Sequence, residues 1–281
     1  MEFHKRLKSI RNLSQHGSPQ QLFYHQYTTN DAKCTDPRDR IYALLGMLPP
    51  ILACHIHPDY SLSVGNIYKK ASLADIKVYR NLKSLIGCDL SERTVTAPTW
   101  VPDWSVYRGT ELVELAKGTA GTLYMPRPKY TEPDILEVTG VRCSIITHVT
   151  EAAPKISSGI LIHDIIACLR KWMPDNLHES SYITGEPLLD AFVATLCFDN
   201  TWLRRYMHWA KKQPYEEYAK IFMDMVVSNR VSTEADIESN PYLSKVLGSV
   251  EGRSFITTKD GRIGLGSRVT EPGKPSHSGL Y

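Results

Sequence analysis

The chain has 281 residues, of which 42% are hydrophobic and 22% charged, and its formal net charge is +3 at pH 7. This composition is typical of a globular protein with one large domain or two modest ones. The small net charge argues against a nucleic-acid partner and against a polybasic membrane surface. We also expect no membrane span, because no apolar stretch approaches the roughly 18 residues that a span needs.

The cysteines indicate a reducing compartment. Six of them stand at wide, irregular spacings without a Cys-x-x-Cys pair, and the first residues lack the apolar core of a signal peptide. We therefore expect reduced, mostly buried thiols and a cytoplasmic location, with the nucleus as the alternative.

The first third of the chain predicts helices joined by extended segments. A helical pattern covers residues 3–29. The next helix is expected over 36–48, because Asp36 can cap it, a proline follows at the first helical position, and Asp39 stands where a capping-box acid would stand. Its apolar face would consist of Ile41, Leu44, Leu45 and Leu48.

Further elements follow in this part of the chain. Gly46 indicates a helix end or a close contact. Residues 64–80 are expected to form a helix, because apolar residues repeat every three or four positions after serines that can cap it. Residues 98–105 contain prolines and two tryptophans, so we expect a rigid, extended loop whose indoles pack on the domain, followed by a surface loop over 106–130.

The second half of the chain mixes strand and helix signals. β-branched residues predict strands over 135–142 and 144–150. Apolar periodicity predicts helices over 160–172, over 187–198, around 202–209 and from 214 onward. An Asp-Gly pair at 260–261, between two β-prone runs, predicts a hairpin. The polar residues 270–281 are expected to be disordered.

These elements together predict a helix-rich α+β fold with a small, mostly antiparallel sheet and a C-terminal β-hairpin. We divide the chain into a first domain over 1–130, a downstream region over 131–269 and a tail over 270–281. The first two would form one unit if the hairpin pairs with the earlier strands.

The charged motif residues allow two interpretations. Arg38 and Asp39 could belong to a capped, solvated or ion-paired helix start. Alternatively they could bridge to the loop 100–104, with Asp103 as the partner of Arg38, because an arginine and a carboxylate form a strong bidentate pair. Either role would be architectural.

Two Pro-Asp-aromatic sequences are candidates for the same local structure. Asp59 before Tyr60, and Asp103 before Trp104, could each bond the nearby backbone in an Asx turn while the aromatic side chain packs inward. The alternative is an exposed recognition surface. Two aromatic strips further on are expected to be core or a groove for a partner helix, with a ligand site as the alternative: Trp202, Tyr206 and Trp209, and Tyr215, Tyr218 and Phe222.

Catalytic and cofactor motifs are scarce in the sequence. Cys54, His55 and His57 provide too few zinc ligands, and we expect neither a metal nor a cofactor. The sequence has no nucleophile elbow, no Walker A loop and no dinucleotide fingerprint followed by a helix. A catalytic triad of residues distant in sequence stays open, so the sequence leaves open whether the chain is an enzyme.

Three segments, in this order, resemble the fungal heterokaryon incompatibility (HET) domain. They are Lys33–Leu48, Pro58–Ser61 and Pro98–Ser105. The strand 136–140 and the hairpin 255–266 also resemble the region downstream of that domain. The motif positions that carry the resemblance are Asp36, Arg38, Asp39, Tyr42, Gly46, Pro58, Asp59, Tyr60, Trp100, Pro102, Asp103 and Trp104.

The resemblance implies a role in fungal nonself recognition and cell death through a protein partner, without catalysis, on a domain related to the TIR fold. It implies no catalytic residue and leaves the oligomeric state open. The opening segments of the family are expected to be missing, so the chain would lack the N-terminal half of the domain. Two alternatives remain: a small cyclase, isomerase or hydrolase of a fungal secondary-metabolite pathway, and a truncated fragment without function.

Overall fold

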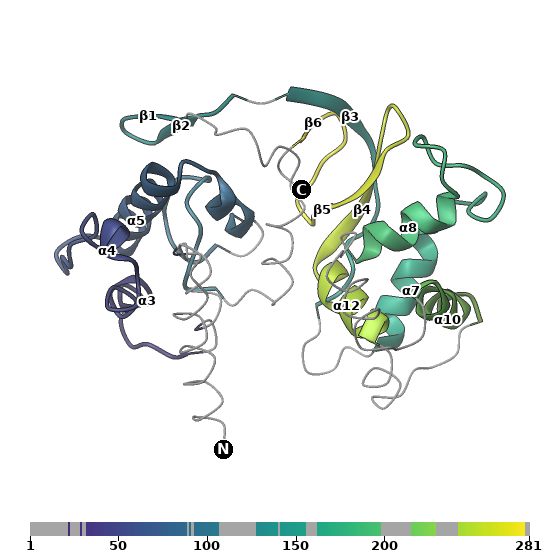
Figure 1. Cartoon of the computed structure of the whole chain (residues 1–281), viewed down its shortest axis with the longest axis horizontal. Coiled ribbons are helices and arrows are strands. Elements are labelled where there is room, and N and C mark those ends of the chain that lie inside the picture. Colours follow the sequence, from purple (N-terminus) through teal and green to yellow (C-terminus); the bar gives the residue numbers. More distant parts are fainter. Residues whose placement is uncertain are drawn as a thin grey trace, which may run out of the picture. The chain divides into compact units, whose positions relative to one another are not determined.

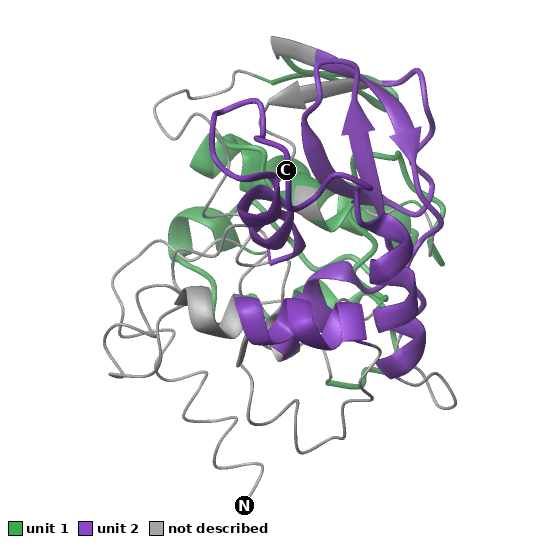
Figure 2. Cartoon of the chain, turned by 90° about the vertical axis from the view of Figure 1, so that its right-hand side faces the viewer, with its two compact units in different colours: residues 1–116, 120–140, 280 green, residues 117–119, 141–279, 281 purple. Residues whose placement is uncertain are grey.

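The computed structural model describes residues 22, 29, 32–88, 90, 93–106, 128–139, 141–155, 162–197, 215–228 and 241–278. The chain forms two compact units, which Figure 2 shows in different colours. Unit 1 holds residues 1–116, 120–140 and 280, and unit 2 holds residues 117–119, 141–279 and 281. The main division therefore falls at 140/141, ten residues later than the boundary expected from the sequence.

Unit 1 combines helices with one small hairpin (Figure 1). Its helical elements are α3 (Asp39–Tyr42), α4 (Pro50–Ala53), α5 (Val64–Tyr79) and a 3₁₀-helix at Lys83–Gly87, and its strands are β1 (Lys129–Thr131) and β2 (Ile135–Glu137). Helix α5 confirms the helix predicted over 64–80. The Ser63 side chain caps it by accepting a hydrogen bond from the Asn66 backbone N–H, and it ends at Arg80, which has a left-handed φ of 50°.

The predicted helix over 36–48 is shorter than expected. After Tyr42 most backbone hydrogen bonds reach back three residues instead of four, as in the bonds from the N–H of Leu44 to the carbonyl of Ile41 and from Met47 to Leu44. Leu44 and Leu48 are nevertheless buried as predicted. Gly46 is exposed, and no atom lies within 4 Å of where its Cβ would be, so the close-contact interpretation is wrong.

A single apolar cluster forms the core of unit 1. It joins α3, α4 and α5 to the loop that carries Trp104. The buried members of this cluster are Leu22, Ile41, Tyr42, Leu44, Leu48, Leu52, Ile56, Ile67, Tyr68, Ala71, Ala74, Val101 and Trp104.

Unit 2 packs helices against a four-stranded antiparallel sheet. Its helices are α7 (Ile162–Trp172), α8 (Leu188–Leu196), α10 (Tyr215–Ser228) and α12 (Pro241–Val250). Its strands are β3 (Val141–Val149), β4 (Arg253–Thr258), β5 (Ile263–Ser267) and β6 (Pro275–Ser278), in the order β5-β4-β3-β6.

The predicted C-terminal hairpin is confirmed. Strands β4 and β5 pair with Phe255 opposite Leu265. Gly261 supplies the turn with a φ of 82°, which glycine adopts without the steric cost of a Cβ. The hairpin also returns to the earlier strand β3, since Ile256 of β4 lies opposite Val149. Because β3, β4 and β5 all belong to unit 2, this pairing does not join the two units.

Two strand predictions need correction. Residues 135–137 do not join this sheet but pair with β1, which lies at the end of the expected surface loop, because the intervening Pro133 and Asp134 form a turn. Residues 275–278, expected to be disordered, form β6 and pair with β3. Strand pairing uses backbone groups, and a proline is tolerated at the first residue of an edge strand, so a polar composition did not prevent it.

The helix predictions in the second half hold where the structure describes them. Helices α7, α8 and α10 lie at the predicted places, whereas the helix expected around 202–209 lies outside the described residues. Helix α12 was missed, although the sequence contains its signal. Leu243, Val246, Leu247 and Val250 follow an i, i+3, i+4, i+7 pattern after a proline, and all four are buried.

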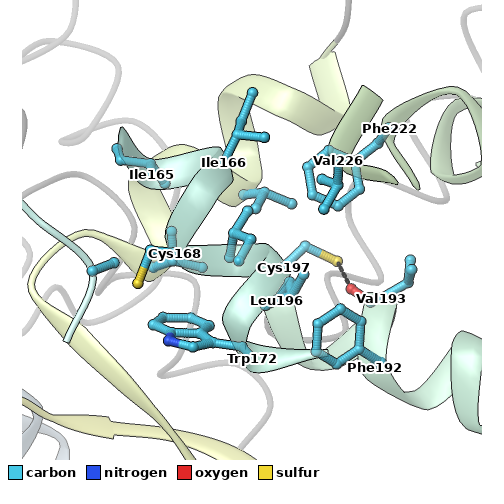
Figure 3. Packing of buried hydrophobic residues seen from close by; sticks show 14 of the residues in the cluster. Ile165, Ile166, Cys168, Trp172, Phe192, Val193, Leu196, Cys197, Phe222 and Val226 are labelled. Atoms are coloured by element: carbon cyan, nitrogen blue, oxygen red, sulfur yellow. Dashed lines mark hydrogen bonds between the residues drawn. The ribbon is translucent and has the colours of Figure 1, made fainter. Parts of the chain in front are cut away.

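The core of unit 2 lies between these helices and the sheet (Figure 3). Phe255 of β4 contacts both the Phe192 ring of α8, at a centroid distance of 5.3 Å, and the Trp172 ring of α7, at 6.1 Å. Cys168 and Cys197 are buried free thiols, and the Sγ of Cys197 donates to the carbonyl of Val193 (Figure 3).

The remaining described cysteines differ from the sequence expectation. Cys34 and Cys54 are exposed and Cys88 is half-buried, so the thiols are not mostly buried.

The prediction of a helix-rich α+β fold with small antiparallel sheets and a C-terminal hairpin is confirmed. Among the helices in the described ranges, none has the length and apolar character needed to cross a membrane.

Candidate functional site

The first two motif segments, Lys33–Leu48 and Pro58–Ser61, meet through Tyr42 and Asp59. The buried Tyr42 ring comes from α3, and its hydroxyl accepts a hydrogen bond from the Asp59 N–H at 2.9 Å and donates one to the Asp59 carbonyl at 3.1 Å. Asp59 itself forms the predicted Asx turn, since its carboxylate accepts from the Ser61 N–H at 2.9 Å and from the Ser61 hydroxyl at 2.6 Å. These bonds hold the pKa of Asp59 below its usual value. Pro58, just before this turn, is exposed.

Arg38 ties the same two segments together with its guanidinium group. Its Nε and Nη2 donate to the Asp36 carboxylate at 2.7–3.1 Å, while Nη1 donates to the carbonyls of Tyr60 and, at 3.1 Å, Leu62. The hydrogen bonds between them raise the pKa of Arg38 and lower that of Asp36. The interpretation as an ion-paired helix start is therefore confirmed, and a pairing of Arg38 with Asp103 is wrong.

Tyr60 is the most exposed motif aromatic. Its ring stands edge-on to Tyr42 at 5.1 Å, and the Arg38 guanidinium lies 5.2 Å from its centroid. Its hydroxyl donates to Asp39 at 2.5 Å, and this bond raises the pKa of Tyr60. With 52% of its surface exposed, Tyr60 does not pack inward, so that prediction is wrong for this residue.

Asp103 organises the third segment. One of its oxygens accepts from the Thr94 N–H, the Thr94 hydroxyl and the Val95 N–H at 2.6–3.0 Å, and the other accepts from the Ser105 N–H at 2.9 Å. The predicted Asx turn is thus present. The Asp103 carboxylate already accepts hydrogen bonds from the backbone N–H groups of Thr94, Val95 and Ser105. Its charge is therefore stabilised without Arg38.

The two motif tryptophans have different surroundings. The predicted inward packing of Trp104 is confirmed: its indole is 3% exposed and lies against the Tyr68 ring at 5.2 Å, with Pro102 also buried. The half-buried Trp100 packs edge-on against Tyr130 of β1 at 5.9 Å, and its Nε1 donates to the Asp134 carbonyl at 2.8 Å.

Tyr68 of α5 connects the first segment to the third, and sequence reasoning missed this role. Its hydroxyl donates to the Pro37 carbonyl and shares a hydrogen bond with the Ser105 hydroxyl, each at 2.8 Å. Burial raises its pKa well above the ordinary tyrosine value. The available signal was a tyrosine next to Ile67 on the apolar stripe of α5, since a buried tyrosine needs a partner for its hydroxyl.

The residues that these contacts bring together form what we call the motif cluster. Its members are Asp36, Arg38, Asp39, Tyr42, Asp59, Tyr60, Tyr68, Asp103 and Trp104. Each carboxylate of this cluster accepts a hydrogen bond from another motif residue or from the adjacent backbone. Chemically, the arrangement fixes three chain segments relative to one another.

The other candidate residues do not form a metal site. His55, His57 and Cys54 are exposed, and within the described ranges no group of three or more His, Cys, Asp or Glu side chains is placed to hold a metal ion. In the aromatic strips, Phe222 belongs to the core of unit 2. The side chains of Tyr215 and Tyr218, and the whole strip from Trp202 to Trp209, lie outside the described part of the chain.

No family model, no curated protein and no solved structure matches the chain.

Proposed function

We propose that the chain is a heterokaryon-incompatibility-type protein of fungal nonself recognition and cell death, which acts in the cytoplasm by binding a protein partner rather than by catalysis. The observation that carries this proposal is the meeting of the three HET-like segments, Lys33–Leu48, Pro58–Ser61 and Pro98–Ser105, in one hydrogen-bonded cluster. Tyr42, Arg38 and Tyr68 make the connections.

The hydrogen bonding of the cluster supports a recognition role over a catalytic one. A general acid or base needs a proton-transfer position open to substrate. The carboxylates of Asp36, Asp39 and Asp59 instead accept hydrogen bonds from Arg38, Tyr60 and Ser61 at 2.5–3.1 Å. These bonds favour a fixed surface shape.

The outer side of the cluster offers what a protein partner would contact. Tyr60 presents about half of its surface beside the partly exposed Arg38 and Asp36 side chains. Tyrosine and arginine are enriched among the residues that dominate protein interfaces. Hydrogen bonds already hold the side chains of Tyr60 and Arg38 in place. These two side chains would therefore lose little conformational entropy when a partner binds.

Induced expression in a filamentous fungus tests the proposal, with viability scored beside the level of soluble protein. We expect death with the wild-type chain and survival with Tyr60→Ala at equal soluble level. Ile51→Ala serves as the control, since Ile51 is a 62% exposed apolar side chain outside the cluster and its variant should still kill.

The other outcomes separate the alternatives. Healthy cells with abundant soluble wild-type protein would overturn the proposal, and metabolite profiles with and without the gene would then test the enzyme alternative. Healthy cells without soluble protein would point to a fragment that has lost its function.

A further inference from the structure

The turn between β1 and β2 is held by two side chains of unit 1 that lie outside the ribbon formed by these strands. Lys69 of α5 donates from Nζ to the Pro133 carbonyl at 3.2 Å and to Oδ1 of Asp134 at 3.0 Å. Trp100 donates from Nε1 to the Asp134 carbonyl at 2.8 Å, and its ring stands edge-on to Tyr130 of β1. Three donated hydrogen bonds therefore converge on two consecutive residues of one turn.

All three hydrogen bonds run in the same direction. Lys69 and Trp100 supply only donors, since an ammonium group and an indole N–H cannot accept, and the turn supplies two carbonyls and one carboxylate. Tyr130 shapes the turn from within the ribbon, because its hydroxyl donates to the same Pro133 carbonyl at 2.6 Å. The two donor side chains therefore fit a tight turn that presents two adjacent carbonyls and an acidic residue.

The attachment of the ribbon to the rest of unit 1 is weak. In the described part of the chain, β1 and β2 pair only with each other, and a two-stranded ribbon is marginally stable in water by itself. The turn residues 132–134 are exposed, and Ile135 and Val138 are each about half exposed. The ion pair of Lys69 with Asp134 is partly open to water, with 52% of the Asp134 side chain exposed, so it is individually weak.

A weak site of this kind stays filled because its occupant belongs to the same chain. A tethered group acts at an effective concentration on the order of millimolar, so modest contacts are enough to hold it. A separate molecule that offers the same contacts must compete with the tethered turn. Occupation by the chain itself therefore conceals a site that the side chains of Lys69 and Trp100 already form.

We propose that Lys69 and Trp100 form a binding site for an acidic β-turn, which residues 132–134 of the chain itself occupy and which takes the same kind of turn from a partner protein. The ligand is recognised by two adjacent backbone carbonyls and one carboxylate. This proposal is independent of the proposed function, because neither residue belongs to the motif cluster.

Charge reversal in the turn empties the site. Asp134→Lys places a second cation beside the Lys69 ammonium, so we expect the turn to leave and the Trp100 indole N–H of the full chain to exchange about tenfold faster. Labelling with ¹⁵N-tryptophan follows this signal, and Trp100→Phe assigns it. Adding Lys69→Glu to Asp134→Lys reverses the ion pair and should restore slow exchange. Lys70→Glu, at the neighbouring exposed position of α5, is the matched control and should not restore it.

A peptide then tests whether the emptied site binds a separate molecule. The probe is residues 128–138 of this chain, cyclised head to tail so that Lys129 stays opposite Glu137 and the turn stays preformed. We expect it to shift the Trp100 indole signal of the Asp134→Lys chain with a dissociation constant on the order of millimolar, and to shift that of the wild type far less. The same cyclic peptide with Asp134→Lys is the control and should not bind.

Two results would overturn the proposal. One is a Trp100 indole that exchanges equally fast in the wild type and in Asp134→Lys, and the other is an emptied chain that ignores the cyclic peptide at about 10 mM. If Asp134→Lys does not fold, the wild type provides the test, because salt screens the exposed ion pair. Its Trp100 indole exchange should rise from about 0.01 M to about 1 M sodium chloride, and a rate independent of salt would contradict the site.

Discussion

At the scale of single residues, the buried Trp104 indole and the exposed Tyr60 ring divide the motif cluster into an inner and an outer part. Trp104 contacts the Tyr68 ring and belongs to the core of unit 1. Tyr60 has half of its surface in water but is fixed by Asp39 and Arg38. The inner part therefore belongs to the core of unit 1, and the outer part is exposed to water.

Replacing Trp104 by alanine should destabilise unit 1 by about 3–5 kcal/mol, because a large buried aromatic leaves a cavity that the fold fills only in part. Urea denaturation followed by circular dichroism would measure this change. Trp100→Ala should cost less, since its indole is only half-buried. Unchanged stability with loss of activity in Trp104→Ala would instead make Trp104 a recognition residue.

The geometry of Arg38 predicts that lysine cannot replace it. A lysine has one charged nitrogen and cannot bond the Asp36 carboxylate and the carbonyls of Tyr60 and Leu62 together. We expect Arg38→Lys to lower the free energy of unfolding, because the lysine leaves some of these acceptors without their hydrogen bond.

The control for Arg38 lies in unit 2. Arg262 also pairs with a neighbouring aspartate, Asp260, but its side chain is 54% exposed. Arg262→Lys should stay within about 0.5 kcal/mol of the wild type. If both lysine variants lose the same stability in urea, the two carbonyl contacts of Arg38 add nothing.

At the scale of elements, helix α5 lies very close to the backbone of Thr96 and Ala97 at Gly65. A Cβ at this position would lie 2.1 Å from the Thr96 carbonyl oxygen and 3.3 Å from the Ala97 Cβ. The segment 94–97, which Asp103 holds through Thr94 and Val95, therefore depends on glycine at the start of α5.

Gly65→Ala should destabilise the protein by about 1–3 kcal/mol, because the clash is with backbone that must move. This cost is expected to exceed the gain of up to about 1 kcal/mol that alanine brings in a helix. Thermal unfolding of the Gly65→Ala variant measures this loss of stability. Gly46→Ala serves as the control, since a Cβ at Gly46 meets no atom within 4 Å. A neutral Gly65→Ala would contradict the tight packing of α5.

Elements with strong local signals were predictable from the sequence. The cap and apolar stripe of α5 and the Asp-Gly turn at 260–261 are local properties, and both elements lie where they were expected. Strand β6 was not predictable, because its polar residues pair with β3 through backbone groups that composition does not reveal. Helix α12 had a readable pattern that was overlooked.

The same division applies to the motif cluster. The Asx turns of Asp59 and Asp103 involve residues two positions away and were anticipated. The partners of Arg38 and Tyr68 lie up to 37 residues away in sequence, so tertiary packing selects them. The burial of Asp75 was missed for the same reason, since an acidic residue on a helix is normally expected at the surface.

At the scale of the whole molecule, each unit has a core of its own. The apolar cluster of unit 1 contains Trp104 and Tyr68, the cluster of unit 2 contains Phe222 and Phe255, and the two clusters have no residue in common. A unit that buries its own apolar residues can unfold as a cooperative element by itself.

Calorimetry should therefore resolve two unfolding transitions, and substitutions in the two cores should act on different ones. Trp104→Ala is expected to lower the transition of unit 1 alone, and Phe222→Ala, at a fully buried position of α10, that of unit 2 alone. Each change should cost about 3–5 kcal/mol in its own unit. In the double variant the two effects should add, because the substituted side chains belong to clusters without a shared member. A single transition that both substitutions lower would show that the units fold as one cooperative structure, and the division at 140/141 would then have no energetic meaning.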